Sequence, residues 1–539
     1  MTGTAERYAE AVAHFTAGLN DQAEEACRKI VAQDDHQADA HNLLGLTLRR
    51  RGDHASALIS FDRAAEINPS LAPIHLNRGL TLTQLGRMGE AEAAFRQALQ
   101  SDPASSPAHF HLGVILHHRA QYDEATEHLA AVAEAEPNHA NTRAMMGVGL
   151  LMLGRLSEAK VSLIEATELN PALSTPHDGL GVIAEVEGRF EEAIGHFDSA
   201  LTLDPNFATA HFNRAVARLR RGDLAQGLPE FEWRWRLPRD ASAAAMRDFP
   251  QPLWTGEHLG DKALLVWGEQ GLGDEIRAAG VVDDMARRGD KIVLECDERL
   301  LPLLQRSMPD VQCVARQTPA ATETTAAKVG WQCPGDTLLR HVRPTLDRFS
   351  QRTSYVVADG ARRTTFQTRL KEIAKNRPII GVSWSSQNAK FMHGKSLPLA
   401  AWAPLLASKD CCFVDLQYGE TAAERATCQR GHGVCLTHLP DLDAMTDIDG
   451  LAALISACDL VITVSNTTAH LAGALGTPTW VMVPFGHFQP WYWFSTRTDS
   501  PWYPSVRLYR QSKVDDWPAV LDRMTKDFSN WPPSAAISP

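Results

Sequence analysis

Several features that define large classes of proteins are missing from this sequence of 539 residues. It has no run near the ~18 consecutive apolar residues of a membrane-spanning helix. Its start lacks the basic segment and apolar stretch of a secretory signal. Lys and Arg total 53 against 65 Asp and Glu, and the net charge of -12 argues against a nucleic-acid partner. We expect a cytoplasmic protein with no membrane span and no nucleic-acid partner.

Cysteine is also sparse and follows no pattern. The nine cysteines form no CxxC pair, and eight of them lie in the second half of the chain. This distribution fits neither a disulfide framework nor a zinc site, so we expect buried thiols and no metal ion. What the chain does have is a globular composition, with 44% hydrophobic and 22% charged residues. At roughly 150 residues per domain, the length predicts three or four domains.

Three kinds of residue recur at intervals of 34 in the first 237 residues. The glycines let two helices approach closely, and the alanines share a helical face with large apolar residues four positions later. The prolines end the second helix of each pair. The series are Gly45, Gly79, Gly113, Gly147 and Gly181; Ala57, Ala91, Ala125, Ala159 and Ala193; and Pro69, Pro103, Pro137, Pro171 and Pro205. The pattern resembles the tetratricopeptide repeat (TPR), with clear repeats from about Ala38 to Phe207 and weaker ones at both ends.

The repeats predict an α-solenoid over residues 1–237, with about six or seven repeats when the caps are included. The concave face of such a stack commonly holds a polypeptide, and a scaffold or dimerisation arm is the alternative. Asn77 and Asn213 share one repeat position, and we assign them to acceptor binding because their amides can hold a peptide backbone. Most repeats also carry a histidine four residues before the glycine. Neighbouring helices stand ~8–10 Å apart, too far to share a metal ion, so packing or groove polarity is the expected role.

Residues 238–260 are rich in aromatic, basic and turn residues and predict a linker. Beyond them, apolar runs of strand length alternate with helical stretches, which predicts parallel sheets. The expected strands are 263–267, 291–295 and 311–315, and then, after Pro378, 379–384, 411–417, 459–464 and 479–484. We expect an α/β unit of two Rossmann-like lobes, residues 261–376 and 377–539, with a ligand cleft between them. The fold class is thus an α-solenoid followed by two such lobes.

A glycine-rich turn, GEQGLGDEIR at residues 268–277, follows the first of these strands. Gly271 and Gly273 permit a tight turn with close backbone approach, and Asp274 opens the next helix. Asp274 is the candidate catalytic carboxylate. The alternative is that it only caps the helix.

A second candidate site, SNTTAHLAGALG at residues 465–476, follows the third strand of the second lobe. Asn466 is a good helix N-cap, the backbone amides of Thr467 and Thr468 lie in the first turn, and His470 faces the same end. Such a helix start binds phosphate well, and we assign these four residues to the donor. A capped helix packed through alanines is the alternative.

A polar loop at residues 385–397 follows the first strand of the second lobe and carries Lys390, His393 and Lys395. Cations at a strand end can neutralise a phosphate leaving group, and Lys395 is the one we select. A surface lysine without a role is the alternative.

Two further segments have competing interpretations. Asp441, Asp443, Asp447 and Asp449 imitate a metal motif, but their place before a helix favours electrostatic stabilisation of its amino end. The tail at residues 491–505 is dense in Trp and Tyr, which can stack on a base or sugar or close the core between the lobes.

Together these stretches resemble the GT-B glycosyltransferases related to bacterial heptosyltransferases, and the whole chain resembles their TPR-fused relatives, including flagellin-glycosylating transferases. The matching stretches are LLVWGEQGLGDEIR, GVSWSSQNAKFMHGKSLPL, DLQYGE, LAALISACDLVITVSNTTAHLAGALGTPTWVMVP and the tail with WYW and SPWYPS. The resemblance implies an acidic residue near the acceptor at Asp274. It implies donor contacts at Ser385, Lys395, Gln417, Asn466, Thr467, Thr468 and His470. Heptosyltransferases usually carry Asp where Ser465 stands here, and this departure argues against heptose as the donor sugar.

The resemblance implies a metal-independent glycosyltransferase that moves a sugar from a nucleotide-sugar to Ser or Thr hydroxyls of a protein, with flagellin as the expected acceptor held by the solenoid. No cofactor beyond the nucleotide-sugar co-substrate is expected. Two alternatives stay open. One is a catalytically silent adaptor or chaperone, which Ser465 favours, and the other is a lipopolysaccharide glycosyltransferase, which leaves the solenoid without an obvious task.

Overall fold

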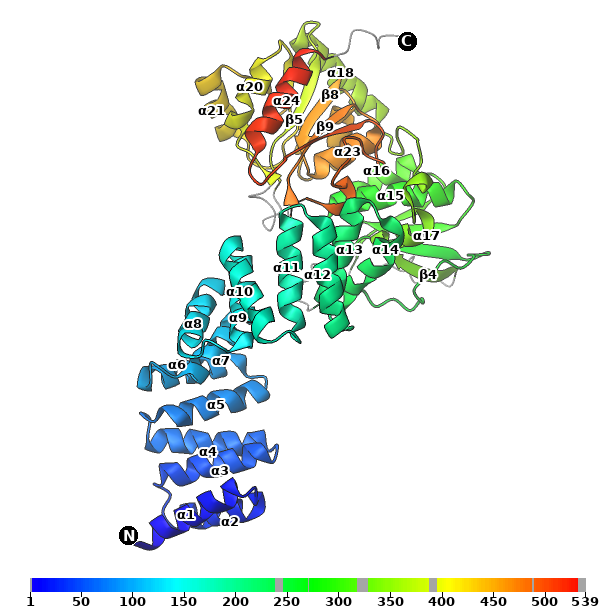
Figure 1. Cartoon of the computed structure of the whole chain (residues 1–539). Helices are drawn as coiled ribbons and strands as arrows, with labels where there is room; N and C mark the ends of the chain where they lie inside the picture. The colour runs from blue at the N-terminus through cyan, green and yellow to red at the C-terminus, as the bar shows by residue number, and fades with distance from the viewer. Residues whose placement is uncertain are drawn as a thin grey trace. The chain divides into compact units, whose positions relative to one another are not determined.

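The computed structural model describes residues 2–237, 246–269, 271–317, 328–386, 395–486 and 489–531. The chain divides into two compact units, Met1–Ile183 with Thr202–Asp204 and Ala184–Leu201 with Pro205–Pro539. The first unit is helical, and the second holds the end of the helical array and two parallel sheets (Figure 1). Within the described ranges, no helix has the length and apolar character needed to cross a bilayer.

The first unit is a stack of helix pairs that repeats the same contact. Gly45, Gly79, Gly113 and Gly147 each lie on the first helix of a pair, against the large apolar residue of the second helix. A Cβ on Gly45 would stand 2.6 Å from the Phe61 ring, and one on Gly79 would stand 2.5 Å from Phe95. The helices are α1 (Thr2–Thr16), α2 (Asn20–Gln33), α3 (Ala38–Arg50), α4 (His54–Ile67), α5 (Ala72–Gln84), α6 (Met88–Ser101), α7 (Ser106–His118), α8 (Tyr122–Ala135), α9 (Ala140–Met152), α10 (Leu156–Leu169) and α11 (Ser174–Val186). The predicted repeats are confirmed, and the glycines are required because no side chain fits between the paired helices.

The repeat histidines bind the backbone. The ring nitrogen Nε2 of His75 lies 2.7 Å from the carbonyl oxygen of Pro69, which ends the preceding helix pair. His109 and His211 make the same contact with Pro103 and Pro205, at 2.9 and 3.0 Å. Each ring therefore ties a first helix to the loop before it, since a helix end leaves carbonyl groups without helical partners.

The array ends in the second unit with α12 (Phe190–Leu203), α13 (Ala208–Arg221), α14 (Leu224–Phe231) and the 3-10 turn η1 (Glu232–Arg236). Two buried arginines of this end contact segments that belong to the two lobes. Arg220 of α13 pairs with Glu185 at 2.6 Å and donates to the carbonyl of Gln489 at 3.0 Å, beside η7 (Trp491–Trp493). Arg234 of η1 pairs with Glu269 after the first strand at 3.0 Å. The last repeat thus contacts the two lobes at separate points.

The two lobes each contain one all-parallel sheet. The first has the order β3-β2-β1-β4 and the second β10-β9-β8-β5-β6-β7. The strands are β1 (Ala263–Trp267), β2 (Ile292–Cys296), β3 (Gln312–Ala315), β4 (Val329–Pro334), β5 (Ile379–Ser383), β6 (Cys412–Asp415), β7 (Leu436–Thr437), β8 (Leu460–Val464), β9 (Thr479–Val483) and β10 (Val506–Arg510). All the expected strands are present, and the α/β prediction is confirmed. β4, β7 and β10 were not predicted.

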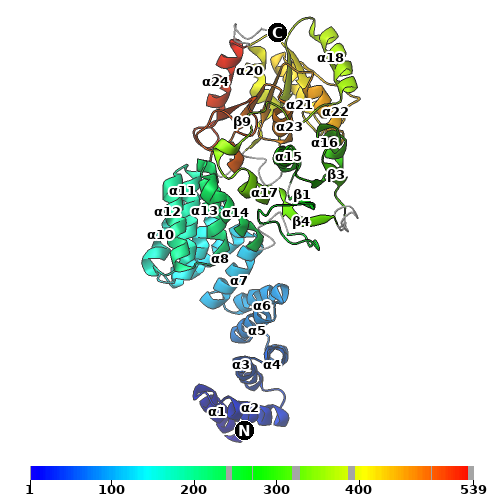
Figure 2. The same ribbon diagram turned by 90° about the vertical axis from the view of Figure 1, so that its right-hand side faces the viewer.

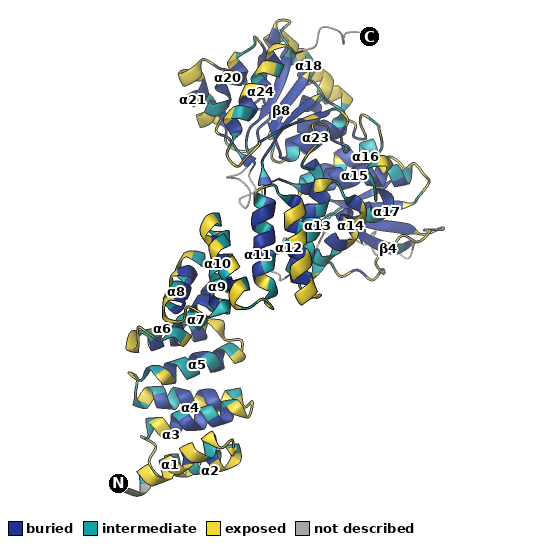
Figure 3. Ribbon diagram, viewed as in Figure 1, coloured by how far each residue is buried: buried dark blue, intermediate teal, exposed yellow. Residues whose placement is uncertain are grey.

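Helices cover the sheets and meet between the lobes. They are α15 (Leu272–Ala286), α16 (Leu301–Ser307), α17 (Gly335–Val342), α18 (Gly360–Ala374), α20 (Ala403–Ala407), α21 (Ala422–His432), α22 (Ile448–Ile455), α23 (Thr467–Leu475) and α24 (Trp517–Ser529). Figures 1 and 2 both show α15 of the first lobe beside α23 of the second, where the helices contact each other. Figure 3 shows that β8 and α23 are largely buried, which fits their continuous apolar runs.

Candidate functional site

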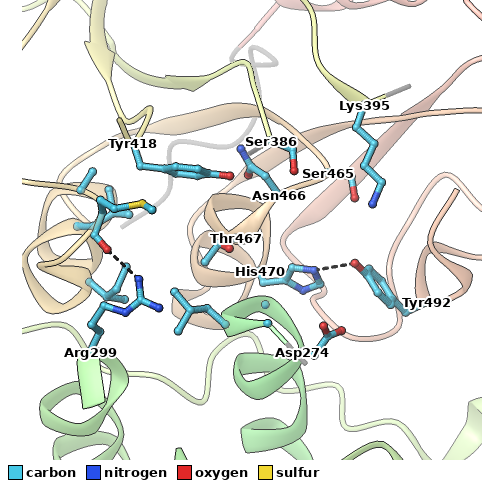
Figure 4. Close-up of a pocket in the computed structure, with 17 residues that line it drawn as sticks. Asp274, Arg299, Ser386, Lys395, Tyr418, Ser465, Asn466, Thr467, His470 and Tyr492 are labelled. Carbon is cyan, nitrogen blue, oxygen red and sulfur yellow. Dashed lines mark hydrogen bonds between the residues drawn. The ribbon is translucent and has the colours of Figure 1, made fainter. Parts of the chain in front are cut away.

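A cavity of about 310 Å³ lies where the two lobes meet. The first lobe contributes the turn before α15 and Arg299 of η2 (Glu298–Leu300). The second lobe contributes the start of α23, the start of α22, Tyr418 after β6, Lys395, and Tyr492 of η7. Figure 4 shows Thr467 between Tyr418 and Arg299 on one side and Lys395, Tyr492 and Asp274 on the other. The cavity sits beyond the carboxyl ends of β1, β5 and β8, where parallel sheets bind ligands.

The glycine turn makes the close approach between the lobes possible. A Cβ on Gly273 would stand 2.7 Å from Cδ2 of His470, so only glycine fits between α15 and α23. Gly271 is the N-cap of α15 with an ordinary φ of -94°, and no atom lies within 4 Å of where its Cβ would be. Of the two predicted glycines, only position 273 therefore requires the absence of a side chain.

Asp274 points into the cavity from the first turn of α15 (Figure 4). Its side chain is 25% exposed, and one carboxylate oxygen accepts a hydrogen bond from Nη2 of Arg277 at 3.0 Å. The N-cap position belongs to Gly271, so Asp274 does not cap this helix. A partly exposed carboxylate held by a buried arginine can accept a proton from a group in the cavity.

Asn466 builds the opposite wall. Its Oδ1 accepts from the backbone N–H of Ala469 at 3.3 Å and so caps α23, while its Nδ2 donates to Ser383 Oγ at 2.8 Å and to the Ser385 carbonyl at 3.0 Å. The amide joins the loops after β5 and β8. Thr467 lines the cavity in the first turn of α23, where backbone N–H groups have no helical acceptor and attract anions.

Three of the assigned donor residues lie behind the cavity wall. Gln417 is buried, and its Oε1 accepts from the backbone N–H groups of Trp384 at 3.0 Å and Ser385 at 2.9 Å. Thr468 is fully buried. Ser385 donates its backbone N–H to Gln417, and its neighbour Ser386 lines the cavity instead. These residues shape the loop after β5, and direct contact with a donor stays a prediction for them.

His470 is buried between the lobes. Its Nδ1 lies 2.8 Å from the hydroxyl of Tyr503 and its Nε2 lies 3.3 Å from that of Tyr492, the contact dashed in Figure 4. Burial, reinforced by the positive charges of Arg277 and Lys395, lowers the pKa of His470 to about 3. The ring is therefore neutral at physiological pH and lends no positive charge to a phosphate. Its phosphate contact stays a prediction.

Lys395 lines the cavity and, with Arg299, is one of its two basic side chains among the described residues. The side chain is 9% exposed, and burial lowers its pKa from 10.5 to about 8, against the opposing effect of the Asp274 carboxylate. Below pH 8 the ammonium keeps its proton in a poorly hydrated place. A cation held there is prepared to meet an anionic group. Lys390 and His393 of the same loop lie outside the described residues.

Several cavity residues were not predicted. Arg299 and Tyr418 lie at the end of the cavity where Ala444, Met445, Ile448 and Leu451 supply apolar surface. Tyr492 lines the other end, within the aromatic tail. Tyr418 directly follows Gln417, so the DLQYGE stretch carried a signal for it, whereas Arg299 sits in an ordinary surface-like segment, ERL, that no motif marks.

Ser465 lines the cavity, and the hydroxyl accepts a hydrogen bond from the indole N–H of Trp493 at 2.8 Å. A neutral hydroxyl beside a donor replaces the carboxylate of the heptosyltransferase pattern. The cavity therefore differs chemically from that pattern at Ser465, the point where the sequence departs from it.

The acidic segment and the aromatic tail have structural partners. Asp447 caps α22 by accepting from the N–H of Gly450 at 2.8 Å, and Asp449 and Asp441 pair with Arg306 and Arg369. In the part of the chain that the structure describes, no group of three or more His, Cys, Asp or Glu side chains is arranged to hold a metal ion. The tail rings pack together, with Trp491 and Trp502 centroids 6.0 Å apart.

The two asparagines assigned to the acceptor lie in different units. Asn77 is on α5 of the first unit and donates to Asn42 Oδ1 on α3 at 3.1 Å, while Asn213 is on α13 of the second unit. Asn77 thus links neighbouring repeats, and acceptor binding by either residue stays a prediction.

Fold and cavity together define a tetratricopeptide solenoid joined to a two-lobed unit of the GT-B type. The family comparison agrees: residues 8–72, 82–147 and 187–222 match tetratricopeptide repeats. Residues 344–492 match glycosyltransferase family 9 (heptosyltransferase). The chain carries TPR repeats followed by a glycosyltransferase family 9 domain.

Comparison with curated and solved proteins finds partial relatives. Protein FlbA of Caulobacter vibrioides is 30% identical over 337 residues, which is 59% of this chain and 55% of FlbA. The chain thus spans about half the length of this relative. Among solved structures, YrrB, described as a TPR protein with an unusual peptide-binding site, is 24% identical over 35% of this chain and 96% of its own, with a TM-score of 0.33. MamA is 20% identical over 32% of this chain and 94% of its own, with a TM-score of 0.30.

Proposed function

We propose that this chain transfers a sugar from a nucleotide-sugar to Ser or Thr hydroxyls of a protein acceptor that the solenoid holds, with flagellin as the acceptor. The observation that supports this most directly is the cavity between the lobes. It has the carboxylate of Asp274 on one wall, and the amino end of α23 and Lys395 on the other. A cavity of about 310 Å³ suits a compact ligand.

In this proposal the donor lies along the cavity with its base at the apolar end and its sugar near Asp274. The apolar surface near Tyr418 and Met445 suits a planar base, which stacks on aromatic and apolar side chains. The phosphate then lies at the first turn of α23, near Thr467, and the sugar lies toward Asp274 and Tyr492. Lys395 stands at the sugar end, where negative charge develops as the nucleotide leaves.

The chemistry follows from these positions. The oxygen of the acceptor hydroxyl attacks the anomeric carbon, and the bond from that carbon to the phosphate oxygen breaks. The proton passes to Asp274, because a hydroxyl is a poor nucleophile until a base accepts its proton. The phosphate leaves with the electron pair, stabilised by the helix amino end and the Lys395 ammonium. Orientation in the cavity lowers the barrier further, by up to ~7–11 kcal/mol in favourable cases.

The test compares Asp274→Asn with Asp261→Asn, a fully exposed carboxylate of the same lobe. Each variant replaces the wild-type gene in the source organism, and we measure the intact mass of the flagellin and its co-purification with the variant. The proposal expects Asp274→Asn to lose the sugar mass and keep its flagellin partner, while Asp261→Asn keeps both. Unchanged flagellin mass with retained co-purification would support the silent adaptor that the Ser465 departure favours. A mass change confined to lipopolysaccharide would instead indicate a glycolipid acceptor.

The donor is identified by thermal unfolding with UDP-, GDP-, ADP- and CMP-linked sugars. A ligand that binds only the folded state raises the unfolding temperature by mass action, by about 2.7 kcal/mol of free energy at 100 times its Kd. The expected result is stabilisation by one nucleotide class that Lys395→Met abolishes.

A further inference from the structure

A buried arginine connects the candidate carboxylate to the aromatic tail. Arg277 lies one helical turn after Asp274 on α15 and is 1% exposed. Its Nη2 donates to Asp274 at 3.0 Å and to Asp336 of α17 at 2.7 Å. Its guanidinium carbon lies 4.9 Å from the ring centroid of Trp491, 4.7 Å from that of Tyr492 and 5.1 Å from that of Trp502. We call these three rings of the second lobe the arginine cage.

We propose that Arg277 is a positioning residue for Asp274, that it aims the carboxylate at the cavity, and that the arginine cage holds Arg277 in place. This inference rests on the proposed function, because it assigns Asp274 its base role. The cage comes from the second lobe and Asp274 from the first. The base is therefore assembled only when the aromatic tail is docked against α15.

The polar contacts of Arg277 are concentrated on one nitrogen. Both carboxylates accept from Nη2, and within the described ranges the buried Nε and Nη1 have no hydrogen-bond partner. The rest of the guanidinium lies against aromatic rings and gains cation–π attraction, which is strongest when the cation is removed from water. In an ordinary buried ion pair, oxygen atoms would accept hydrogen bonds from Nε and Nη1. Here the three rings face the guanidinium and partly offset the cost of leaving these N–H groups without acceptors.

Arg277 stays protonated although it is buried. Burial opposes the charged form, but the carboxylates of Asp336 and Asp274 raise the pKa of the Arg277 guanidinium. The other charged or titratable groups that act around Asp274 are Asp336 of α17, Tyr492 of η7, His470 of α23 and Lys395. Of these His470 is neutral, and Arg277 is a cation that contacts Asp274 directly, at 3.0 Å.

The chain offers a matched control in Arg343. It is also buried, at 4% exposure, and its Nε and Nη2 donate to Asp284 at 2.9 and 2.6 Å. Its guanidinium carbon lies 5.9 Å from the centroid of the same Trp502 and 5.2 Å from that of Phe349. Arg343 matches Arg277 in burial, in a carboxylate partner and in ring contact, but it has no contact with Asp274.

The experiment uses full-length Arg277→Met, Arg277→Lys and Arg343→Met. Carboxyl-¹³C aspartate is incorporated, and the Asp274 signal is assigned by its loss in Asp274→Asn. The proposal expects the chemical shift of this signal to change in Arg277→Met, because the carboxylate loses the hydrogen bond from Nη2 that fixes its position. Arg277→Lys restores part of the difference, and Arg343→Met leaves the signal unchanged.

A second measurement uses flagellin and the nucleotide-sugar found by thermal unfolding. The expected result for Arg277→Lys is a kcat lowered at least tenfold with a donor Kd within twofold of wild type. Equal losses in the Arg277 and Arg343 variants, or an Asp274 signal that does not move in Arg277→Met, would overturn the proposal. If wild type itself transfers no sugar, the proposed function fails while the Asp274 signal still decides the role of Arg277. If Arg277→Met does not fold, Arg277→Lys carries both measurements.

Discussion

Replacing Lys395 by Met is expected to stabilise the folded protein at neutral pH and to remove donor binding. The substitution keeps the unbranched stem and deletes the ammonium. Because burial lowers the pKa of Lys395 from 10.5 to about 8, keeping it charged costs the folded state. At about 1.4 kcal/mol per pH unit, that difference corresponds to a cost of about 3 kcal/mol below pH 8.

The difference in unfolding free energy between the two proteins should also depend on pH, and this dependence is a more specific test. Between pH 8 and pH 10.5 the unfolded chain binds the Lys395 proton and the folded chain does not, so the free energy of unfolding of wild type rises with pH. The Met variant lacks this rise. Its advantage over wild type should therefore shrink by about 2 kcal/mol between pH ~7 and pH ~9.5.

The assay is thermal unfolding of both proteins at the two pH values, with Lys371→Met, an exposed lysine on α18, as the control. The control should follow wild type. Donor binding to wild type should also take up protons above pH 8, because an anion in the cavity favours the ammonium. Calorimetry in two buffers of different ionisation enthalpy measures that uptake. Equal pH dependence of Lys395→Met and wild type would refute the reasoning.

Three further substitutions test the framework. Gly273→Ala should lower the unfolding temperature and abolish transfer, because its Cβ would stand 2.7 Å from the His470 ring. The control is Gly271→Ala, whose Cβ would meet no atom within 4 Å and which should change neither quantity. Asn466→Ala should cost about 2 kcal/mol and weaken donor binding, since it removes a helix cap and the bridge between two loops; unchanged thermal unfolding would contradict the cap assignment. His75→Leu should cost about 1 kcal/mol by losing a hydrogen bond, with His75→Gln retaining part of it, as urea unfolding of the first unit would measure.

Much of the fold could be predicted because its signals are local. The 34-residue period places Gly45 against Phe61, and the long apolar runs of β1, β5, β8 and β9 belong to strands buried on both faces. β10 was missed because VRLYR alternates polar and apolar residues at a sheet edge, inside a segment dominated by aromatic residues. β7 has two residues, too few for any pattern.

The candidate site was predicted less completely, since its geometry joins residues far apart in the chain. Strand ends revealed Asp274 and Asn466, because the loops after parallel strands meet at one edge of a sheet. The sequence does not reveal that Gln417 lies behind the cavity wall, nor that burial and two nearby cations keep His470 neutral. Nor does it reveal Arg277, whose role depends on rings more than 200 positions away.

The joint between the last repeat and the lobes bears on how this protein can be dissected or recombined. Arg220 donates to the Gln489 carbonyl, and Arg234 pairs with Glu269, so the last segments of the repeat array also hold the two lobes. A truncation at residue 237 would leave the buried carboxylate of Glu269 and the carbonyl of Gln489 without these arginine partners. A catalytic fragment for expression, or a graft onto a foreign repeat array, should therefore begin before α11 and keep the final helices with the lobes.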